Sequence, residues 1–335
     1  MVRRRPTPAP PNRGKTAIPA FLRYFLSRLA GAMATIVVGS FLVFLVMKAA
    51  PGNPALIVLG DFATPEAIAK FNREQGLDQP VLLQYARWLI GLAHFDFGES
   101  LAFASGQSIA ELIAFRLPNT VFVGLYALLI AVLVSLVLGT MAALRRGGAV
   151  DTLATSISAL GVSMPDFWLG YMLILGLSIG LGLFPSYGFV PASQSLVGAL
   201  HSGFLPALAI AAPMAAVFAR TLRAALVDNM DRDHVVVAKS FGHPRRFIFI
   251  HHVFRNSIIP FIVLIGLQVR YLLGGVVIIE RIFGIQGLGS LMVEAAFARD
   301  YYVVQACAVI FLAIVLVVNF VVDVICAMLD PKRMS

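Results

Sequence analysis

Six long runs of apolar residues, separated by shorter polar stretches, dominate the sequence. They lie at about 29–46, 118–143, 154–183, 204–226, 258–279 and 304–328. Roughly 20 helical residues cross the hydrocarbon core of a bilayer, and each run is long enough to do so. The pattern therefore predicts an all-α, polytopic membrane protein whose six transmembrane helices lie within residues 21–335.

The longest polar interruption, residues 51–117, has the pattern of amphipathic helices. Thr64-Pro65-Glu66 is typical of a helix start, and Gly76 of a helix end. A second helix is predicted by apolar and aromatic side chains that share one helical face, at Val81, Tyr85, Trp88 and Leu92. Ser108-Ile-Ala-Glu111 fits a capping box and predicts a third, short helix.

The distribution of positive charge predicts the orientation of the spans. Most of the 26 Lys and Arg residues precede the first run, follow the second, fourth or sixth, or lie at the ends of these runs. Because cytoplasmic segments carry such an excess, we expect both termini in the cytoplasm. Residues 51–117 then form an extracytoplasmic helical loop, and residues 228–257 a cytoplasmic loop. The Arg-, Pro- and Ala-rich residues 1–20 are predicted to be a disordered cytoplasmic tail.

The first apolar run has two interpretations. Its length exceeds the apolar core of a signal peptide, which favours an uncleaved signal-anchor helix. Cleavage near Lys48-Ala-Ala-Pro51 is the alternative.

Composition excludes several classes of protein. Hydrophobic residues make up 59% of the chain and charged residues 13%, more apolar side chain than a soluble core of this length needs. The net charge of +9 would suit nucleic acid only if the basic residues shared one solvated face. Their distribution favours the anionic inner leaflet of a lipid bilayer instead. Cys307 and Cys326 lie far apart along one run, so no disulfide or metal site is predicted.

The most polar segment of the carboxy-terminal half runs from Arg220 to Pro260. Its centre, residues 233–246, carries Gly242 and Pro244 between two short helical patterns, which predicts a bend. Its density of arginines is incompatible with hydrocarbon. A polar, bent and helical loop between two spans suits docking of another protein.

The residues of this segment also resemble those of a known family. Arg223 to Gly242, followed by His251-His-Val-Phe-Arg-Asn-Ser-Ile-Ile-Pro260, is similar to the cytoplasmic coupling loop of binding-protein-dependent ABC importer permeases. The oligopeptide, dipeptide and nickel branch of that family matches best. The resemblance covers roughly residues 21–333 and continues through the motifs Phe44–Pro54, Gly76–Pro80, Arg116–Thr120, Ser163–Gly170, Gly266–Gln268, Leu273–Gly275, Gly287–Gly289, Arg299–Tyr301 and Leu329–Pro331.

The resemblance implies a type I ABC importer permease fold and one half of a translocation pore. The implied partners are a second, homologous permease subunit, two cytoplasmic ATP-binding subunits and an extracytoplasmic substrate-binding protein. This chain has no Gly-x-x-x-x-Gly-Lys-Ser/Thr loop and no convincing catalytic set, so we expect ATP and Mg on the ATPase subunits and no cofactor or catalytic residue here. The implied mechanism is alternating access, driven by the ATPases through the coupling loop in the bacterial cytoplasmic (inner) membrane.

The resemblance also implies which residues couple to the ATPases. Gly242 would form the turn of the loop, and Pro244 would begin the next segment. The full set is Asp233, Val236, Val237, Ala238, Lys239, Gly242, Pro244, Arg245 and Arg246. Where importers of this class carry Glu-Ala-Ala, or Arg-Thr-Ala in the peptide branch, this chain has Val236-Val237-Ala238, which favours docking by apolar packing. Contact of the basic residues with lipid headgroups is the alternative.

The substrate implied by the branch is a peptide. Nickel chelates, glutathione, opines and sugars remain alternatives within the family. A secondary transporter or channel is the alternative from another class, but such carriers usually show repeated halves and several deep ionisable residues. Here the deep charges are chiefly Arg270 and Asp323. Co-purification with ATPase subunits would distinguish the two classes.

Three residues are candidates for the substrate path: Ser163, Gln268 and Arg270. An unpaired guanidinium in the middle of a span costs at least about 2.5 kcal/mol, so Arg270 needs a partner or a wet cavity. The hypothesis is that Arg270 interacts with the carboxylate of a passing peptide. A structural ion pair, with Asp323 as the candidate partner, is the alternative.

Substitution of Arg270 separates these two roles. If Arg270 contacts substrate, Arg270→Gln lowers uptake per assembled complex about tenfold, the value of one charge-assisted hydrogen bond. Arg270→Lys keeps the charge and retains part of the uptake. Uptake is measured against the amount of permease in the membrane; loss of protein with normal flux per surviving complex contradicts the substrate role.

Overall fold

The computed structural model describes residues 17–50, 52 and 54–329, and this part of the chain is helical without a β-strand. The predicted tail, residues 1–20, lies mostly outside the described residues. The α-helices are α1 (Ala17–Ala49), α2 (Pro54–Leu59), α3 (Pro65–Glu74), α4 (Val81–Ala93), α5 (Ile109–Leu144), α6 (Ala149–Ser163), α7 (Asp166–Leu173), α8 (Leu196–Met230), α9 (Asp233–Ser240), α10 (Arg245–Ile248), α11 (Arg255–Phe283), α12 (Leu288–Phe297) and α13 (Tyr301–Leu329). A 3₁₀ turn, η1 (Gly60–Phe62), and two π-helical segments, η2 (Ile174–Gly180) and η3 (Phe249–Phe254), complete the set.

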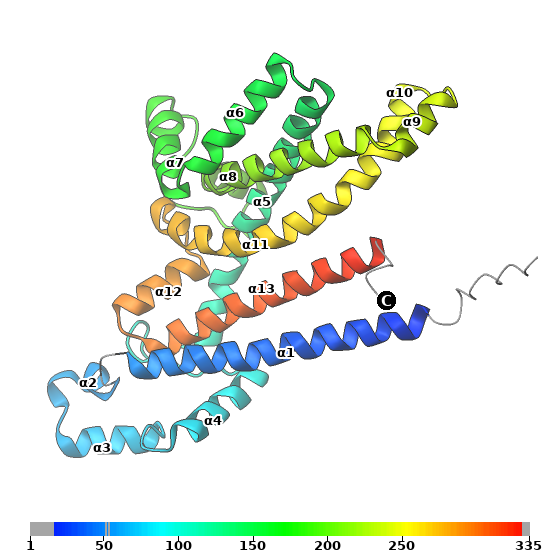
Figure 1. Cartoon of the computed structure of the whole chain (residues 1–335). Coiled ribbons are helices and arrows are strands. Elements are labelled where there is room, and N and C mark those ends of the chain that lie inside the picture. The colour runs from blue at the N-terminus through cyan, green and yellow to red at the C-terminus, as the bar shows by residue number, and fades with distance from the viewer. Residues whose placement is uncertain (1–16, 51, 53, 330–335) are drawn as a thin grey trace, which may run out of the picture.

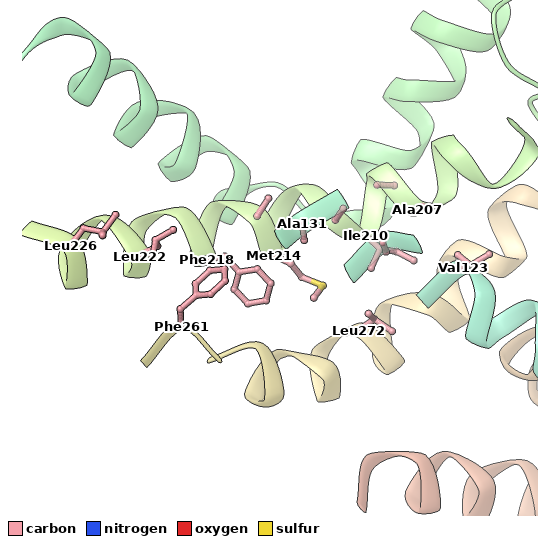
Figure 2. Packing of buried hydrophobic residues seen from close by; sticks show 14 of the residues in the cluster. Val123, Ala131, Ala207, Ile210, Met214, Phe218, Leu222, Leu226, Phe261 and Leu272 are labelled. Carbon is pink, nitrogen blue, oxygen red and sulfur yellow. The ribbon is translucent and has the colours of Figure 1, made fainter. Parts of the chain in front are cut away.

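Helix α8 forms the centre of the main core. It packs most extensively against α5 and then against α11 (Figure 2). Alanines along α8 let the neighbouring helices approach closely, as in other membrane bundles. Larger side chains fill the remaining space, with Phe218 of α8 meeting Phe261 of α11 at a ring-centroid distance of 5.6 Å. Both rings are fully buried.

The described helices include five that are long and apolar enough to cross a membrane, or up to seven if each bent pair counts as one span. The six predicted spans lie within this range. The run at 154–183 is not one straight helix, because α6 and the α7–η2 segment meet at an angle of 106°. Pro165 lies at the break, where its missing N–H and its restriction of Met164 interrupt the helix.

Helices α1 and α13 pack against each other beside the main core (Figure 1). Arg28 of α1 pairs with Asp323 of α13 at 3.4 Å. The structure therefore gives Asp323 a different ion-pair partner from the Arg270 considered as an alternative above. The side chain of Arg270 itself lies outside the described side chains, and its role stays a prediction.

The segment after α1 contains the predicted amphipathic helices. Thr64 caps α3 by accepting a hydrogen bond from the Ala67 N–H at 3.2 Å, as the sequence predicts. Tyr85 of α4 is buried against α1, and its hydroxyl donates to the carbonyl of Val37 at 2.9 Å. The predicted third, short helix is wrong: the helix that follows Ser108 continues through Pro118 as the 36-residue α5.

A buried carboxylate joins this segment to the start of α13. Asp300 is 1% exposed, and its Oδ2 accepts hydrogen bonds from the Ser100 hydroxyl at 2.7 Å and from the Ala102 and Phe103 N–H groups at 2.9 and 3.1 Å. These bonds compensate for the burial of the charge. The loop before α5 is thereby held against the end of the bundle where α13 begins.

The two ends of the bundle differ in the elements that they carry. The start of α1, the end of α13 and helices α9 and α10 lie toward one end, and α2, α3 and α12 toward the other (Figure 1). The end with α9 is reinforced by two ion pairs to the α5–α6 turn region, Arg146 with Asp231 at 2.7 Å and Arg223 with Asp151.

Close packing of α5 on α8 leaves no room for a side chain at Gly139. A Cβ atom there would lie 2.8 Å from the carbonyl oxygen of Ala219. Gly139→Val is therefore expected to lower the free energy of unfolding by about 1–3 kcal/mol through overpacking. Thermal unfolding of the purified protein in detergent measures this. Gly31→Val is the matched control, since nothing lies within 4 Å of its position in α1; equal destabilisation by both variants contradicts the argument.

Candidate functional site

The segment between α8 and α11, residues 231–254, is called the tip below. Helix α9 buries one side and exposes the other. Val235 and Ala238, three residues apart, join the main core. Val236 and Val237 are 57% and 51% exposed, and Phe241 just beyond the helix is 77% exposed. The tip therefore presents an apolar surface, defined here as Val236, Val237 and Phe241.

The bend in the tip is built as the sequence predicts. Gly242 has φ +76°, a left-handed conformation that side chains with a Cβ rarely adopt. Pro244 then has the extended conformation of an N-cap residue, and α10 begins at Arg245. Lys239, Arg245 and Arg246 are all exposed around the bend. Three exposed cations thus lie close in the chain to the apolar surface.

Two of the predicted coupling residues, Asp233 and Ala238, lie on α9 outside the apolar surface. Asp233 occupies the first turn of α9, where its carboxylate interacts favourably with the positive end of the helix dipole. Ala238, predicted to be a coupling residue, is 5% exposed, so its side chain contacts the core and does not face outward. Its place in the structure is that of a spacer beneath the exposed valines.

The two spans that flank the tip, α8 and α11, are hydrogen-bonded to each other near it. Ser257 of α11 donates to the Ala225 carbonyl of α8 at 2.9 Å, and the Asn229 amide donates to the Ser257 hydroxyl at 3.0 Å. Ile248 and Val253 of the tip are also buried in the core. Helix α9 contacts α10 and η3, and η3 contacts α8 and α11, so α9 is linked to both spans through packed side chains.

The predicted path residues lie on two different helices. Ser163 ends α6 and is exposed, with its hydroxyl bonded to the Ala159 carbonyl at 2.9 Å, and Gln268 is half-buried on α11. Between these segments the structure places a polar contact that the sequence analysis missed, from the Tyr271 hydroxyl to Asp166 Oδ1 at 2.8 Å. Gly275 gives Asp166 the room to approach α11.

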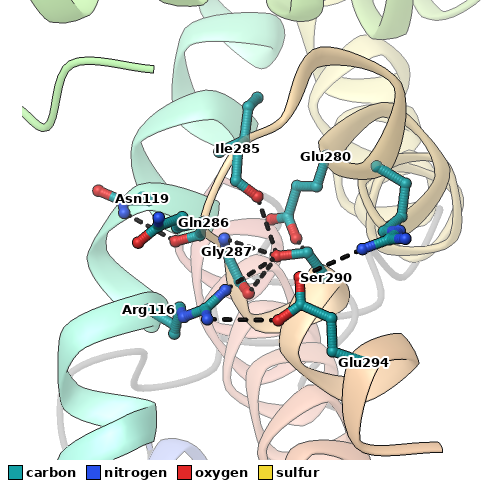
Figure 3. A network of polar contacts seen from close by, with 9 residues as sticks. Arg116, Asn119, Glu280, Ile285, Gln286, Gly287, Ser290 and Glu294 are labelled. Atoms are coloured by element: carbon teal, nitrogen blue, oxygen red, sulfur yellow. Dashed lines mark hydrogen bonds and ion pairs between the residues drawn. The ribbon is translucent and has the colours of Figure 1, made fainter. Parts of the chain in front are cut away.

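A second polar cluster lies at the sharp α11–α12 elbow, where the helices meet at 78° (Figure 3). Glu280 of α11 is fully buried. Its Oε1 accepts from the Thr120 hydroxyl of α5 at 2.6 Å, and its Oε2 from the Ser290 N–H at 2.8 Å. The Thr120 hydroxyl oxygen also accepts from the Leu288 N–H at 2.7 Å. These four residues are called the Glu280 network.

The Glu280 network explains the motif Gly287-Leu-Gly289. A Cβ on either glycine would collide with the Glu280 carboxylate. The glycines leave room for a carboxylate at the start of α12, where unpaired N–H groups and the helix dipole favour negative charge. Sequence analysis missed Glu280 because its partners are separated from it by up to 160 positions.

Charged side chains surround the outside of this elbow (Figure 3). Glu294 of α12 pairs with Arg116 of α5 at 3.3 Å and with Arg281 of α11 at 3.2 Å. Asn119 donates to the Gln286 carbonyl at 2.8 Å. The elbow is therefore bonded to α5 by side chains on three helices.

Known families match nearly the whole chain. The model of binding-protein-dependent transport system inner membrane components matches residues 135–335, and the model of the amino-terminal part of such membrane components matches residues 21–124. A protein of Brucella abortus (strain 2308) described as a candidate peptide transport system permease is 39% identical over 92% of this chain and 97% of its own length. The oligopeptide transport system permease protein AppB of Bacillus subtilis (strain 168) is 32% identical over 92% and 98%. The glutathione transport system permease protein GsiC of Salmonella paratyphi A is 34% identical over the same shares.

The chain belongs to the family of binding-protein-dependent transport system inner membrane components, the membrane-spanning permeases of ABC transporters. The fold agrees. A crystal structure of an amino acid ABC transporter with histidines matches 65% of this chain and 94% of its own, with a TM-score of 0.51 and 17% identity. The predicted type I permease fold is thereby confirmed.

The Glu280 network predicts a stability effect at Thr120. Thr120→Val keeps the shape of the side chain but removes both hydrogen bonds of its hydroxyl, one from a buried N–H and one to a buried carboxylate. We expect a loss of about 2 kcal/mol in the free energy of unfolding. Thr120→Ser keeps the hydroxyl and is the control. Thermal unfolding in detergent compares the two variants, and equal midpoints contradict a role for these bonds.

Proposed function

We propose that this permease forms one half of the translocation path of an ATP-driven peptide importer. The observation that carries the proposal is the tip: an exposed apolar surface, with exposed cations nearby in the chain, on a segment that packs against two spans. Such a surface fits a partner that docks by packing and then moves the spans. The relatives are named as permeases of peptide, oligopeptide and glutathione transport systems, and these names support a peptide as substrate.

The proposed partners follow from this arrangement. Two ATP-binding subunits dock on the tips of this chain and of a second, homologous permease, and they hold the ATP and Mg. A substrate-binding protein delivers peptide to the other end. The exposed Lys239, Arg245 and Arg246 then face acidic groups or carbonyls of the ATPase.

The proposed orientation places the tip and both termini in the cytoplasm and the chain in the bacterial inner membrane. The support is the excess of Lys and Arg in the tip, which is typical of cytoplasmic segments. The helices between α1 and α5 then lie outside, in the extracytoplasmic loop of residues 51–117. Residues 228–257 are the coupling loop within a permease domain of residues 21–335.

The proposed mechanism is alternating access. Closure of the ATPases around ATP displaces α9, and the contacts of Val235 and Ala238 with the core transmit this displacement to α8 and α11. The helices beside Ser163, Gln268 and Arg270 then open the path to the opposite side. Nickel chelates, opines and sugars are alternative cargoes for the same machinery.

Docking on the apolar surface is tested by placing a charge within it. Val237→Asp buries an unpaired carboxylate in the proposed interface, and an interface position of this kind is worth about 2 kcal/mol or more. We expect at least about tenfold less ATPase subunit to co-purify with the permease, and uptake to fall with it.

Val58→Asp is the matched control, because Val58 is also exposed, at 41%, but lies on α2 at the other end of the bundle. It makes the same chemical change away from the proposed interface. Normal ATPase recovery and uptake with Val237→Asp would rule out docking on this surface.

A further inference from the structure

A cavity of about 520 Å³ lies beside the α11–α12 elbow, at the end of the bundle opposite the tip. Helix α5, the segment before α8 and the elbow all line it. Its lining includes Arg116, Asn119, Tyr187, Phe189, Gln194 and Arg281. In the proposed orientation this cavity, called the outer cavity, opens near the entrance of the translocation path.

Two guanidinium groups and two carboxylates line the outer cavity, those of Arg116, Arg281, Glu280 and Glu294. Glu294 is shared by two guanidinium groups, those of Arg116 and Arg281. The other carboxylate of the lining, Glu280, is fully buried and bonded to Thr120 and to the start of α12. Glu280 is thus already compensated by its own donors. Glu294 is therefore the carboxylate of the lining that pairs with both guanidinium groups.

Arg281 is the cation with capacity for a further partner. Its side chain is 48% exposed, against 14% for that of Arg116. Its ion pair to Glu294 joins Nη1 to one oxygen at 3.2 Å. A guanidinium has five N–H donors, arranged to bind a carboxylate with two parallel bonds. Arg281 therefore has donors left for a second carboxylate.

The other walls suit the rest of a peptide. Gln194 is exposed and carries an amide, which both donates and accepts hydrogen bonds as a peptide backbone requires. The Asn119 amide is buried and already donates to the Gln286 carbonyl. Tyr187 and Phe189 add aromatic surface for apolar side chains. A few polar groups on a partly aromatic wall are typical of ligand sites, and the volume lies in their usual range.

We propose that the outer cavity binds the carboxylate of an entering peptide through Arg281. This inference rests on the proposed function and orientation, and it names a substrate contact separate from Ser163, Gln268 and Arg270. The incoming carboxylate competes with Glu294 for Arg281, so Glu294 sets how strongly the cavity holds an anionic end. No bond is made or broken; the site is one of recognition.

The test compares a short peptide with its carboxy-terminal amide, using the complete transporter with its binding protein in proteoliposomes. The measured quantity is uptake of each form by a variant relative to wild type, which cancels any preference of the binding protein. We expect Arg281→Gln to lower uptake of the free acid about tenfold and uptake of the amide less than about twofold. Arg281→Lys keeps part of the uptake of the free acid.

Two further variants complete the design. Glu294→Gln removes the competing carboxylate and is expected to raise the preference for the free acid over the amide. If the Arg281→Gln variant does not assemble into a transporter, the Glu294→Gln variant still tests the inference. Arg73→Gln, at an exposed position of α3 away from the outer cavity, makes the same charge change and is expected to leave the preference unchanged.

Equal effects of Arg281→Gln on both peptides, or no effect on either, overturn the inference. So does an unchanged or reduced preference in Glu294→Gln. These results leave the proposed function intact as long as the wild-type transporter moves peptides. A wild-type transporter that moves neither form contradicts the proposed function itself, and the inference with it.

Discussion

Water is absent from the hydrocarbon core of a membrane, so each polar group of the chain that lies there needs a partner within the protein. Long helices meet this demand along α1, α5, α8 and α13. Breaks in a helix leave N–H and C=O groups without intrahelical partners, and the structure supplies partners at such places. At the α11–α12 break, Glu280 accepts from the Ser290 N–H at the start of α12. The side chain of Asp166, at the break after α6, has its own partner in the Tyr271 hydroxyl.

The need for polar partners also explains where small residues occur in this permease. Residues that bend the chain are accompanied by small residues, because a polar partner must fit beside the backbone. Gly287 and Gly289 make room for Glu280, and Gly275 for Asp166. Two of the motifs that indicate the family, Ser163–Gly170 and Gly287–Gly289, thus lie where the chain departs from straight helices. The tip differs, since its cations and exposed valines require water or a partner protein.

In the proposed mechanism, the two polar regions of the bundle have different tasks. The tip packs on α8 and α11 through buried apolar side chains, and Ser257 bonds these two spans to each other, so the tip suits transmission of movement. The elbow is bonded to α5 by Glu280 and Glu294, so it suits a fixed wall at the far end of the path. A transporter that alternates between two openings needs both a moving lever and a surface that recognises what enters.

The sequence alone determined the all-helical membrane fold, the bend at Gly242 and the family, because long apolar runs, glycine conformation and ordered motifs are local properties. It also predicted α3 and its Thr64 cap. Local patterns placed the start of the helix after Ser108 but made it too short, since packing on α8 carries α5 through Pro118. The prediction of one span at 154–183 did not use Pro165, which lies at the 106° break. Only the tertiary structure showed that Ala238 faces inward, that Asp323 meets Arg28, and that Thr120, Glu280 and Ser290 form one network. Those contacts join residues far apart in the chain, and burial and hydrogen-bond partners depend on how the helices pack.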